Sequence, residues 1–125
     1  KIQANAELLQ WVFENLIRNS VDAINKPVGH IHLSLNYDSG SRLISIIYGD
    51  NGRGIPRKDQ RKIFNPGMTT KKHGWGLGLT LAKRIIEQYH HGQIRLLSTD
   101  ASGTSFEIQI PILQLEEPIL PERLA

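Results

Sequence analysis

The stretch "RLISIIYGDNGRGI" (residues 42–55) joins an apolar segment to a turn that carries one carboxylate and two glycines. The apolar segment predicts a β-strand, which ends at Asp50. Gly52 and Gly54 allow a flat ring to approach the backbone, and the carboxylate can accept a hydrogen bond from an exocyclic amine. The alternative is a purely structural turn, because Asp-Asn-Gly is favourable turn chemistry. Residues 50–54 are therefore a candidate binding turn at the end of a strand.

The elements before this turn are predicted as a helix and a strand. Apolar residues recur at helical spacing over residues 7–25, and Lys26-Pro27 ends that pattern because the residue before proline resists the helical conformation. The segment "HIHLSLNYD" (residues 30–38) then alternates, with Ile31, Leu33 and Leu35 on one face. Together with the strand at residues 42–49 it predicts a hairpin.

The elements after the turn repeat this order. A loop region runs over residues 51–78, interrupted by a short helical piece near residues 58–64. A second helix follows at residues 77–91, and then a second hairpin at residues 93–99 and 104–110. The order predicts an α+β fold, a two-layer sandwich in which about three helices cover one face of a mixed, mostly antiparallel sheet. We expect residues 1–111 to form one domain and residues 112–125 to be a loosely attached tail.

The composition is that of an ordinary soluble domain. Of the 125 residues, 39% are apolar and 22% charged, and no apolar run approaches the ~18 residues that span a bilayer. Without cysteine there are no disulfides or thiolate metal sites. The net charge of +3 suits an anionic ligand, but the basic residues look scattered along the chain, so we expect no nucleic-acid partner. Because the chain begins with Lys1, we expect a segment of a longer polypeptide.

Three polar residues share one side of the first predicted helix. Asn15, Asn19 and Asp22 lie at positions i, i+4 and i+7, within a sector of roughly 60°. Oxygen atoms of amides and carboxylates suit Mg²⁺, which takes few ligands from protein and the rest from water and phosphates. The alternative is a solvated helix face without a ligand.

The second helix is preceded by a glycine cluster and a polar loop. "GWGLGL" (residues 74–79) places bare backbone N–H groups at a helix start, which favours anions. The cluster fits neither the Rossmann fingerprint nor the P-loop, and it can also serve as a hinge. The loop before it carries Thr70 and Lys71, so it is either a lid that reaches a terminal phosphate or a solvated surface loop.

Four motifs in this order resemble a known nucleotide-binding family. "NLIRNSVDA", "DNGRGI", "IFNPGMTTKK" and "GWGLGL" resemble the N, G1, F and G2 boxes of the Bergerat (GHKL) ATP-binding fold, which gyrase, heat-shock chaperone ATPases, histidine kinases and mismatch-repair ATPases share. The second half of the chain is most similar to sensor histidine kinases of bacterial two-component systems, and "ASGTSFEIQIP" looks like their closing segment. The resemblance covers residues 8–111.

The resemblance implies a role for each matching residue. Asn19 would be the Mg²⁺ ligand, Asp50 would bind the adenine amine, and Thr104 would assist Asp50 through water. Phe64 would anchor the lid, and Asn15, Thr70 and Lys71 would act at the γ-phosphate as catalytic residues. The implied nucleotide-binding set comprises Asn15, Arg18, Asn19, Asp22, Asp50, Gly52, Gly54, Ile55, Phe64, Thr70, Lys71, Gly74, Gly76, Leu77, Gly78, Leu79 and Thr104.

The implied function is to bind Mg-ATP and donate its γ-phosphoryl group to a histidine in two-component signal transduction. Two departures qualify the pattern: Asn15 replaces the glutamate of hydrolytic members, which favours transfer to protein over water, and none of the five histidines precedes an acid. The acceptor would lie on a separate dimerisation domain of the same parent protein, with a response regulator as indirect partner. We expect the isolated segment to be cytoplasmic, monomeric and able to bind ATP without autophosphorylation. An anti-sigma-type serine kinase or a degenerate nucleotide-binding module remains the alternative.

Overall fold

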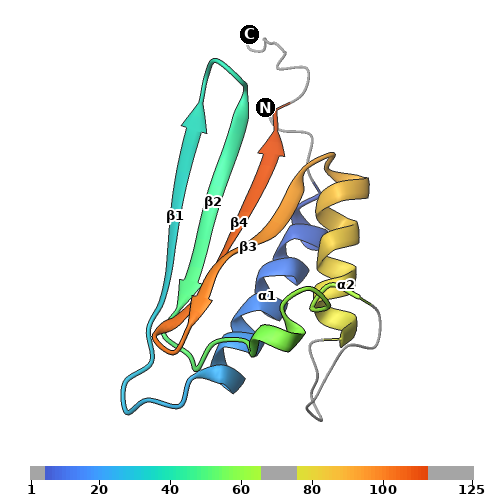
Figure 1. Cartoon of the computed structure of the whole chain (residues 1–125). Helices are drawn as coiled ribbons and strands as arrows, with labels where there is room; N and C mark the ends of the chain where they lie inside the picture. The colour runs from blue at the N-terminus through green and yellow to red at the C-terminus, as the bar shows by residue number, and fades with distance from the viewer. Residues whose placement is uncertain (1–4, 66–75, 113–125) are drawn as a thin grey trace, which may run out of the picture.

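The chain folds as a sheet with helices packed on one side (Figure 1). A computed structural model describes residues 5–65 and 76–112. Its main elements are the helices α1 (Ala6–Ala23) and α2 (Gly76–Arg84) and the strands β1 (Ile31–Asp38), β2 (Leu43–Asp50), β3 (Gln93–Asp100) and β4 (Gly103–Pro111). A two-layer α+β fold is confirmed, with two α-helices in the part that the structure describes.

The sheet has the strand order β1-β2-β4-β3, and each neighbouring pair is antiparallel. The two predicted hairpins therefore lie side by side, joined through β2 and β4. This pairing places Asp50, at the end of β2, directly opposite Thr104 of β4. Two residues that are 54 positions apart in sequence thus meet at one end of the sheet.

Helix α1 begins and ends close to where the sequence predicts. Asn5 is its N-cap, with a side chain that accepts the Leu8 N–H at 3.0 Å, and the backbone turns extended at Ile24. Val12 and Leu16 are buried, whereas Ile17 and Val21 are 43% and 62% exposed. The apolar side of α1 is therefore wider than the surface that the rest of the structure covers.

The second helix differs from the prediction of one regular helix over residues 77–91. After Arg84 it continues as the π-helix Ile85–Tyr89, whose i→i+5 bonds widen the turn. At the end of this segment His90 is buried and Tyr89 is 61% exposed. The His90 Nε2 atom accepts the Asn5 N–H at 2.9 Å, and Nδ1 lies 2.9 Å from the Ile85 carbonyl oxygen. This ring ties the end of the second helix to the start of α1.

The short helical piece predicted near residues 58–64 is smaller than expected. It is the 3₁₀ turn η1 (Arg57–Asp59), followed by further turns. The core lies between the helices and the inner faces of β2, β3 and β4, and its members are Val12, Leu16, Ile46, Tyr48, Ile63, Leu79, Ala82, Ile85, Ile86, Ile94, Phe106, Ile108 and Ile110. In residues 5–65 and 76–112, no helix combines the length and the apolar character that crossing a membrane requires.

Candidate nucleotide-binding site

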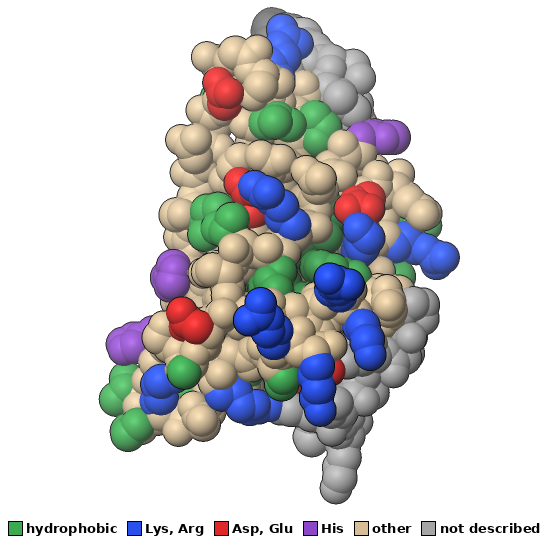
Figure 2. Space-filling view, viewed as in Figure 1, with side chains coloured by type: hydrophobic (Ala, Val, Ile, Leu, Met, Phe, Trp, Pro, Cys, Tyr) green, Lys and Arg blue, Asp and Glu red, His purple; other side chains and the backbone are tan. Residues whose placement is uncertain are grey.

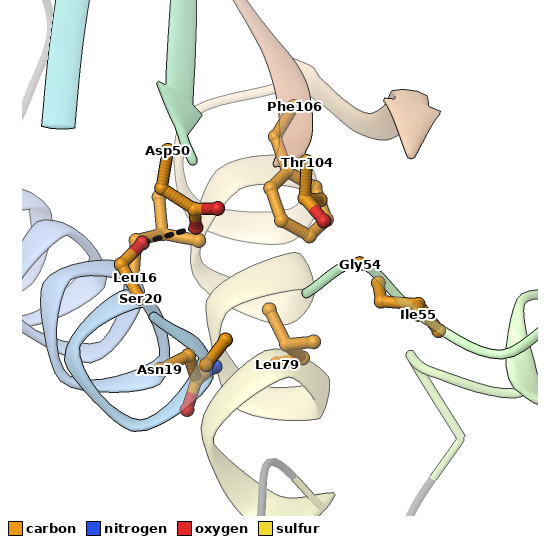
Figure 3. A pocket seen from close by; sticks show the side chains of 10 residues that line it. Leu16, Asn19, Ser20, Asp50, Gly54, Ile55, Leu79, Thr104 and Phe106 are labelled. Carbon is orange, nitrogen blue, oxygen red and sulfur yellow. Dashed lines mark hydrogen bonds between the residues drawn. The ribbon is translucent and has the colours of Figure 1, made fainter. Parts of the chain in front are cut away.

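A hollow that is open to solvent lies where β2 ends (Figure 3). Its walls come from α1, the end of β2, the turn after it, α2 and β4. The lining residues are Leu16, Asn19, Ser20, Ala23, Asp50, Gly54, Ile55, Leu79, Thr104 and Phe106. Six of them were predicted from sequence, and Leu16, Ser20, Ala23 and Phe106 were not.

The carboxylate of Asp50 is held in position by two donors. Its Oδ2 accepts the Ser20 hydroxyl at 2.6 Å, the dashed bond in Figure 3, and its Oδ1 accepts the Gly52 N–H at 2.8 Å. The Ser20 oxygen also lies 2.8 Å from the Tyr48 hydroxyl. Because an ionised carboxylate only accepts, Ser20 donates to Asp50, and Tyr48 in turn donates to Ser20. A buried chain of hydroxyls thus orients the acid, which keeps further acceptor capacity for a ligand.

Tyr48 stabilises this chain by staying protonated. Burial, together with the negative charge of Asp50, raises the pKa of Tyr48 to about 12 against the opposing effect of the Ser20 hydrogen bond. The tyrosine therefore remains a donor throughout the neutral range. Sequence reasoning missed both hydroxyls, although one signal was present. Ser20 continues the buried row of Val12 and Leu16 at i+4 spacing, where a polar residue needs a partner.

Thr104 lies beside Asp50 and belongs to a second hydroxyl pair. Its Oγ1 is 2.8 Å from the Thr99 Oγ1 of β3, which also accepts the Ile55 N–H at 2.9 Å. These bonds fasten the binding turn to the second hairpin. Gly54, in the same turn, packs closely against the end of β3. Its φ of +85° favours glycine, and a Cβ there would collide with the Asp100 carbonyl oxygen.

Lys26 joins two turns around the hollow. Its Nζ donates to the carbonyl oxygens of Asn51, Gly52 and Ala101 at 2.7, 3.1 and 3.0 Å. From the sequence, Lys26 was noted only as part of the signal that ends the first helix. Its role as a donor could not be predicted, because the three carbonyls come from two distant segments that meet only in the folded chain. Its charge is thus used to hold backbone carbonyls.

The predicted polar stripe of α1 divides between two surroundings. Asn19 lines the hollow and Arg18 is exposed, whereas Asn15 is only 9% exposed and its Nδ2 donates to the Trp11 carbonyl at 3.0 Å. A Cβ at Gly78 would lie 2.7 Å from the Asn15 Oδ1, so Asn15 sits between the two helices and does not line the hollow. A phosphate contact or catalytic role for Asn15 stays a prediction.

The donor set suits a magnesium ion that takes few protein ligands. Asp22 Oδ2 is buried without a hydrogen-bond partner, one helical turn from the Asn19 amide that lines the hollow. Within the described ranges, no group of three or more His, Cys, Asp or Glu side chains is placed to bind a metal. A small hard cation held by one or two oxygens of α1, with phosphate and water completing its shell, fits these residues.

The start of α2 forms the far wall of the hollow. Gly76 is its first residue, and the buried Leu79 reaches the hollow from its first turn. Phe64 packs edge-to-face on Phe106, with ring centroids 6.3 Å apart, and Thr80 Oγ1 donates to the Phe64 carbonyl at 3.0 Å. The predicted residues Thr70, Lys71 and Gly74 lie outside the described residues, as does the side chain of Leu77.

Positive charge gathers near the hollow. Figure 2 shows Lys and Arg side chains concentrated on the lower half of the viewed face. Five of the fifteen basic residues fall within residues 53–62, which begin in the binding turn and continue beyond it. All five are exposed: Arg53, Arg57, Lys58, Arg61 and Lys62. The prediction that the basic residues are scattered along the chain is therefore wrong for this segment, which concentrates a third of them. Such a field raises the local concentration of polyanions.

Comparison with known proteins identifies relatives for most of the chain. The family described as "Histidine kinase-, DNA gyrase B-, and HSP90-like ATPase" matches residues 4–114. The signal transduction histidine-protein kinase AtoS of Escherichia coli K12 is 43% identical over 112 residues, which are 89% of this chain and 18% of that protein. Sporulation kinase B of Bacillus subtilis 168 is 36% identical over 88% of this chain and 25% of its own length. The chain thus spans a quarter or less of these curated relatives.

Solved structures agree with the fold. The catalytic domain of the histidine kinase ThkA superimposes with a TM-score of 0.76 at 30% identity, covering 89% of this chain and 70% of that one. The mycobacterial sensor histidine kinase MprB gives a TM-score of 0.75 at 21% identity, which supports the fold alone.

Proposed function

Because this chain belongs to the family of histidine kinase-, DNA gyrase B- and HSP90-like ATPases, we propose that it is the ATP-binding catalytic part of a sensor histidine kinase. In this role it binds Mg-ATP and passes the γ-phosphoryl group to a histidine elsewhere in its parent protein. The names of the curated relatives support a histidine acceptor, and no observation favours the serine-kinase or degenerate-module alternatives.

The observation that carries this proposal is the oriented carboxylate of Asp50. Adenine presents its exocyclic amine as a donor, whereas guanine presents a carbonyl oxygen in the same place. An acceptor-only group therefore favours adenine and opposes guanine. Ser20 and Gly52 already hold the carboxylate in one orientation, so ligand binding costs little conformational entropy at this side chain. Thr104 beside it supplies a hydroxyl that can bridge to the base through water.

The phosphates would extend from the base toward the ends of the two helices. Backbone N–H groups at the start of α2, including those of Gly76 and Gly78, favour the negative charge there. Asn19, with Asp22 behind it, would hold Mg²⁺, which supplies neutralisation of the charge on the triphosphate when bound. Arg18, Thr70 and Lys71 would add contacts to the terminal phosphates.

Phosphoryl transfer needs mainly positioning and charge neutralisation. The position one turn before Asn19 is an amide, Asn15, which cannot take a proton from water as a carboxylate can. We therefore expect transfer to a protein histidine on a separate dimerisation domain, and a response regulator as the later recipient. We expect this reaction to take place in the cytoplasm. The isolated chain would be a monomer that binds ATP without phosphorylating itself.

Calorimetric titration tests the proposal. Purified chain is titrated with ATP and with GTP, each with and without Mg²⁺, and the series is repeated with Asp50→Asn. The expected result is ATP-selective binding that the substitution abolishes, because the asparagine amide turns a donor toward the adenine amine or loses one of its two supports. No ATP binding up to millimolar concentration, or equal binding of ATP and GTP, would overturn it. A histidine-containing domain supplied in trans then tests the transfer step.

A further inference from the structure

A chain of hydrogen bonds runs from the binding turn through β3 to Thr104. The Ile55 N–H donates to the Thr99 Oγ1 atom at 2.9 Å, and this atom lies 2.8 Å from the Thr104 Oγ1 atom. Thr104 is 8% exposed and lines the hollow (Figure 3), whereas Thr99 does not line it. Thr99 can therefore act on a ligand in the hollow only through the two residues to which it is hydrogen-bonded.

The direction of the bond between the two threonines follows from the protons that are available. The Ile55 N–H is a fixed donor, so the Thr99 oxygen accepts from it and still has its own hydroxyl proton to donate. The Thr104 oxygen is in place to accept that proton. Among the residues that the structure describes, the Thr104 side chain forms no other hydrogen bond. A Thr104 hydroxyl that accepts from Thr99 is therefore free to donate its own proton to a ligand in the hollow.

The hollow then presents an acceptor and a donor next to each other. Tyr48 donates to Ser20 and Ser20 donates to Asp50, so that chain of hydrogen bonds ends in an acceptor, the carboxylate. The chain through Thr99 ends in a donor. Thr104 pairs directly with Asp50 across β4 and β2, so both ends lie in one row of the sheet. The Watson–Crick edge of adenine carries the complementary pair, an amine that donates beside the ring nitrogen N1 that accepts.

We propose that Thr99 is a positioning residue, which makes the Thr104 hydroxyl a donor toward the N1 side of adenine. The inference rests on the proposed function, because it requires adenine in the hollow. A water that accepts from Thr104 keeps both of its protons, so it donates one to N1 and the other to Asp50 and gives the base the same polarity. Guanine presents a carbonyl oxygen and an N–H in these two places, so both chains of hydrogen bonds oppose it.

A nucleotide analogue tests the inference, because it separates recognition of N1 from a general change in the hollow. In 1-deaza-ATP a C–H group replaces N1 and cannot accept a hydrogen bond. The affinities for ATP and for 1-deaza-ATP, both with Mg²⁺, are measured by calorimetry for the parent chain, Thr99→Val and Thr99→Ser. Ser98→Ala is the matched control, because it removes an exposed hydroxyl from the adjacent position of β3. The ratio of the two affinities is the readout, since a hollow that is merely loosened would bind both nucleotides more weakly by the same factor.

The parent chain and Ser98→Ala should bind ATP about tenfold more tightly than 1-deaza-ATP, as expected for one hydrogen bond to the base. Thr99→Val should reduce this ratio to about twofold by weakening ATP binding, and Thr99→Ser should keep the parent ratio because it keeps the hydroxyl. In a Thr104→Val background, which already lacks the donor, Thr99→Val should leave the ratio unchanged.

A ratio that Thr99→Val leaves at the parent value would overturn the inference, because Thr99 would then only support the turn. A parent chain that binds the two nucleotides equally, or a Thr99→Ser chain that behaves like Thr99→Val, would also overturn it, while ATP binding and the proposed function stand. Absence of ATP binding to the parent chain would overturn the proposed function together with the inference. Thr99→Ala, which removes the hydroxyl without adding a methyl group, repeats the test should Thr99→Val fail to fold.

Discussion

Replacing Ser20 with alanine removes the centre of the hydroxyl chain that orients Asp50. The Tyr48 hydroxyl, in a side chain that is 1% exposed, loses its acceptor, and Asp50 loses its 2.6 Å donor. A buried donor left without a partner costs roughly 1–3 kcal/mol, and water can partly replace the bond to the half-buried carboxylate. We expect the free energy of unfolding to fall by about 2 kcal/mol, a large share of the ~5–15 kcal/mol of an ordinary domain.

A double-mutant cycle separates this mechanism from a simple loss of packing. Urea unfolding is measured for Ser20→Ala, Tyr48→Phe and the pair. Because phenylalanine has no hydroxyl to leave unpaired, Ser20→Ala should cost about 1 kcal/mol less in the Tyr48→Phe background. ATP affinity of Ser20→Ala should fall by about tenfold, close to 1.4 kcal/mol, since the carboxylate is no longer held in one orientation. Additive costs, or unchanged ATP affinity with a fully folded variant, would refute the reasoning.

Four further outcomes are expected. Gly54→Ala should lower the free energy of unfolding, measured by urea titration, by more than about 2 kcal/mol, because the φ of Gly54 is +85° and a Cβ there meets the Asp100 carbonyl. As a control, Gly40→Ala on an open turn should change it by less than about 0.5 kcal/mol. Asn19→Ala should leave ATP binding largely insensitive to Mg²⁺ in calorimetry, and a retained Mg²⁺ effect would exclude this asparagine as the ligand. Folding raises the pKa of Tyr48 from 10.0 to about 12. The stability that its protonated form contributes is therefore complete below pH 10 and is lost as the pH rises toward 12. Tyr48→Phe should flatten this decline in the free energy of unfolding across that range. Lys26→Met should lower the melting temperature and leave three carbonyls without their ammonium donor, and a melting temperature equal to that of the parent would show that the two turns do not need the clamp.

The sequence alone determined the elements and much of the binding turn. The apolar period of 3.6 in residues 7–25 predicts a helix, and the alternation in the two hairpins predicts strands. Each period brings the apolar side chains of its element onto one face, which the fold can bury. Asp50 and Gly54 were identified for the same reason, since a turn with an acid and glycines is a local feature. Asn19 was indicated by the polar side of the first helix, and the family resemblance added Leu79 and Thr104. The structure gathers all three around one hollow.

Tertiary structure alone decided which residues support that turn. Ser20 meets Asp50 from 30 positions away and Lys26 meets Ala101 from 75 positions away, and no local period encodes such contacts. His90, which follows the π-helical turn, likewise accepts a hydrogen bond from Asn5, 85 positions away in sequence. Burial also depends on the whole fold. The alternation in β1 places Leu35 on its apolar side, but whether Leu35 is covered depends on which helices lie over that half of the sheet.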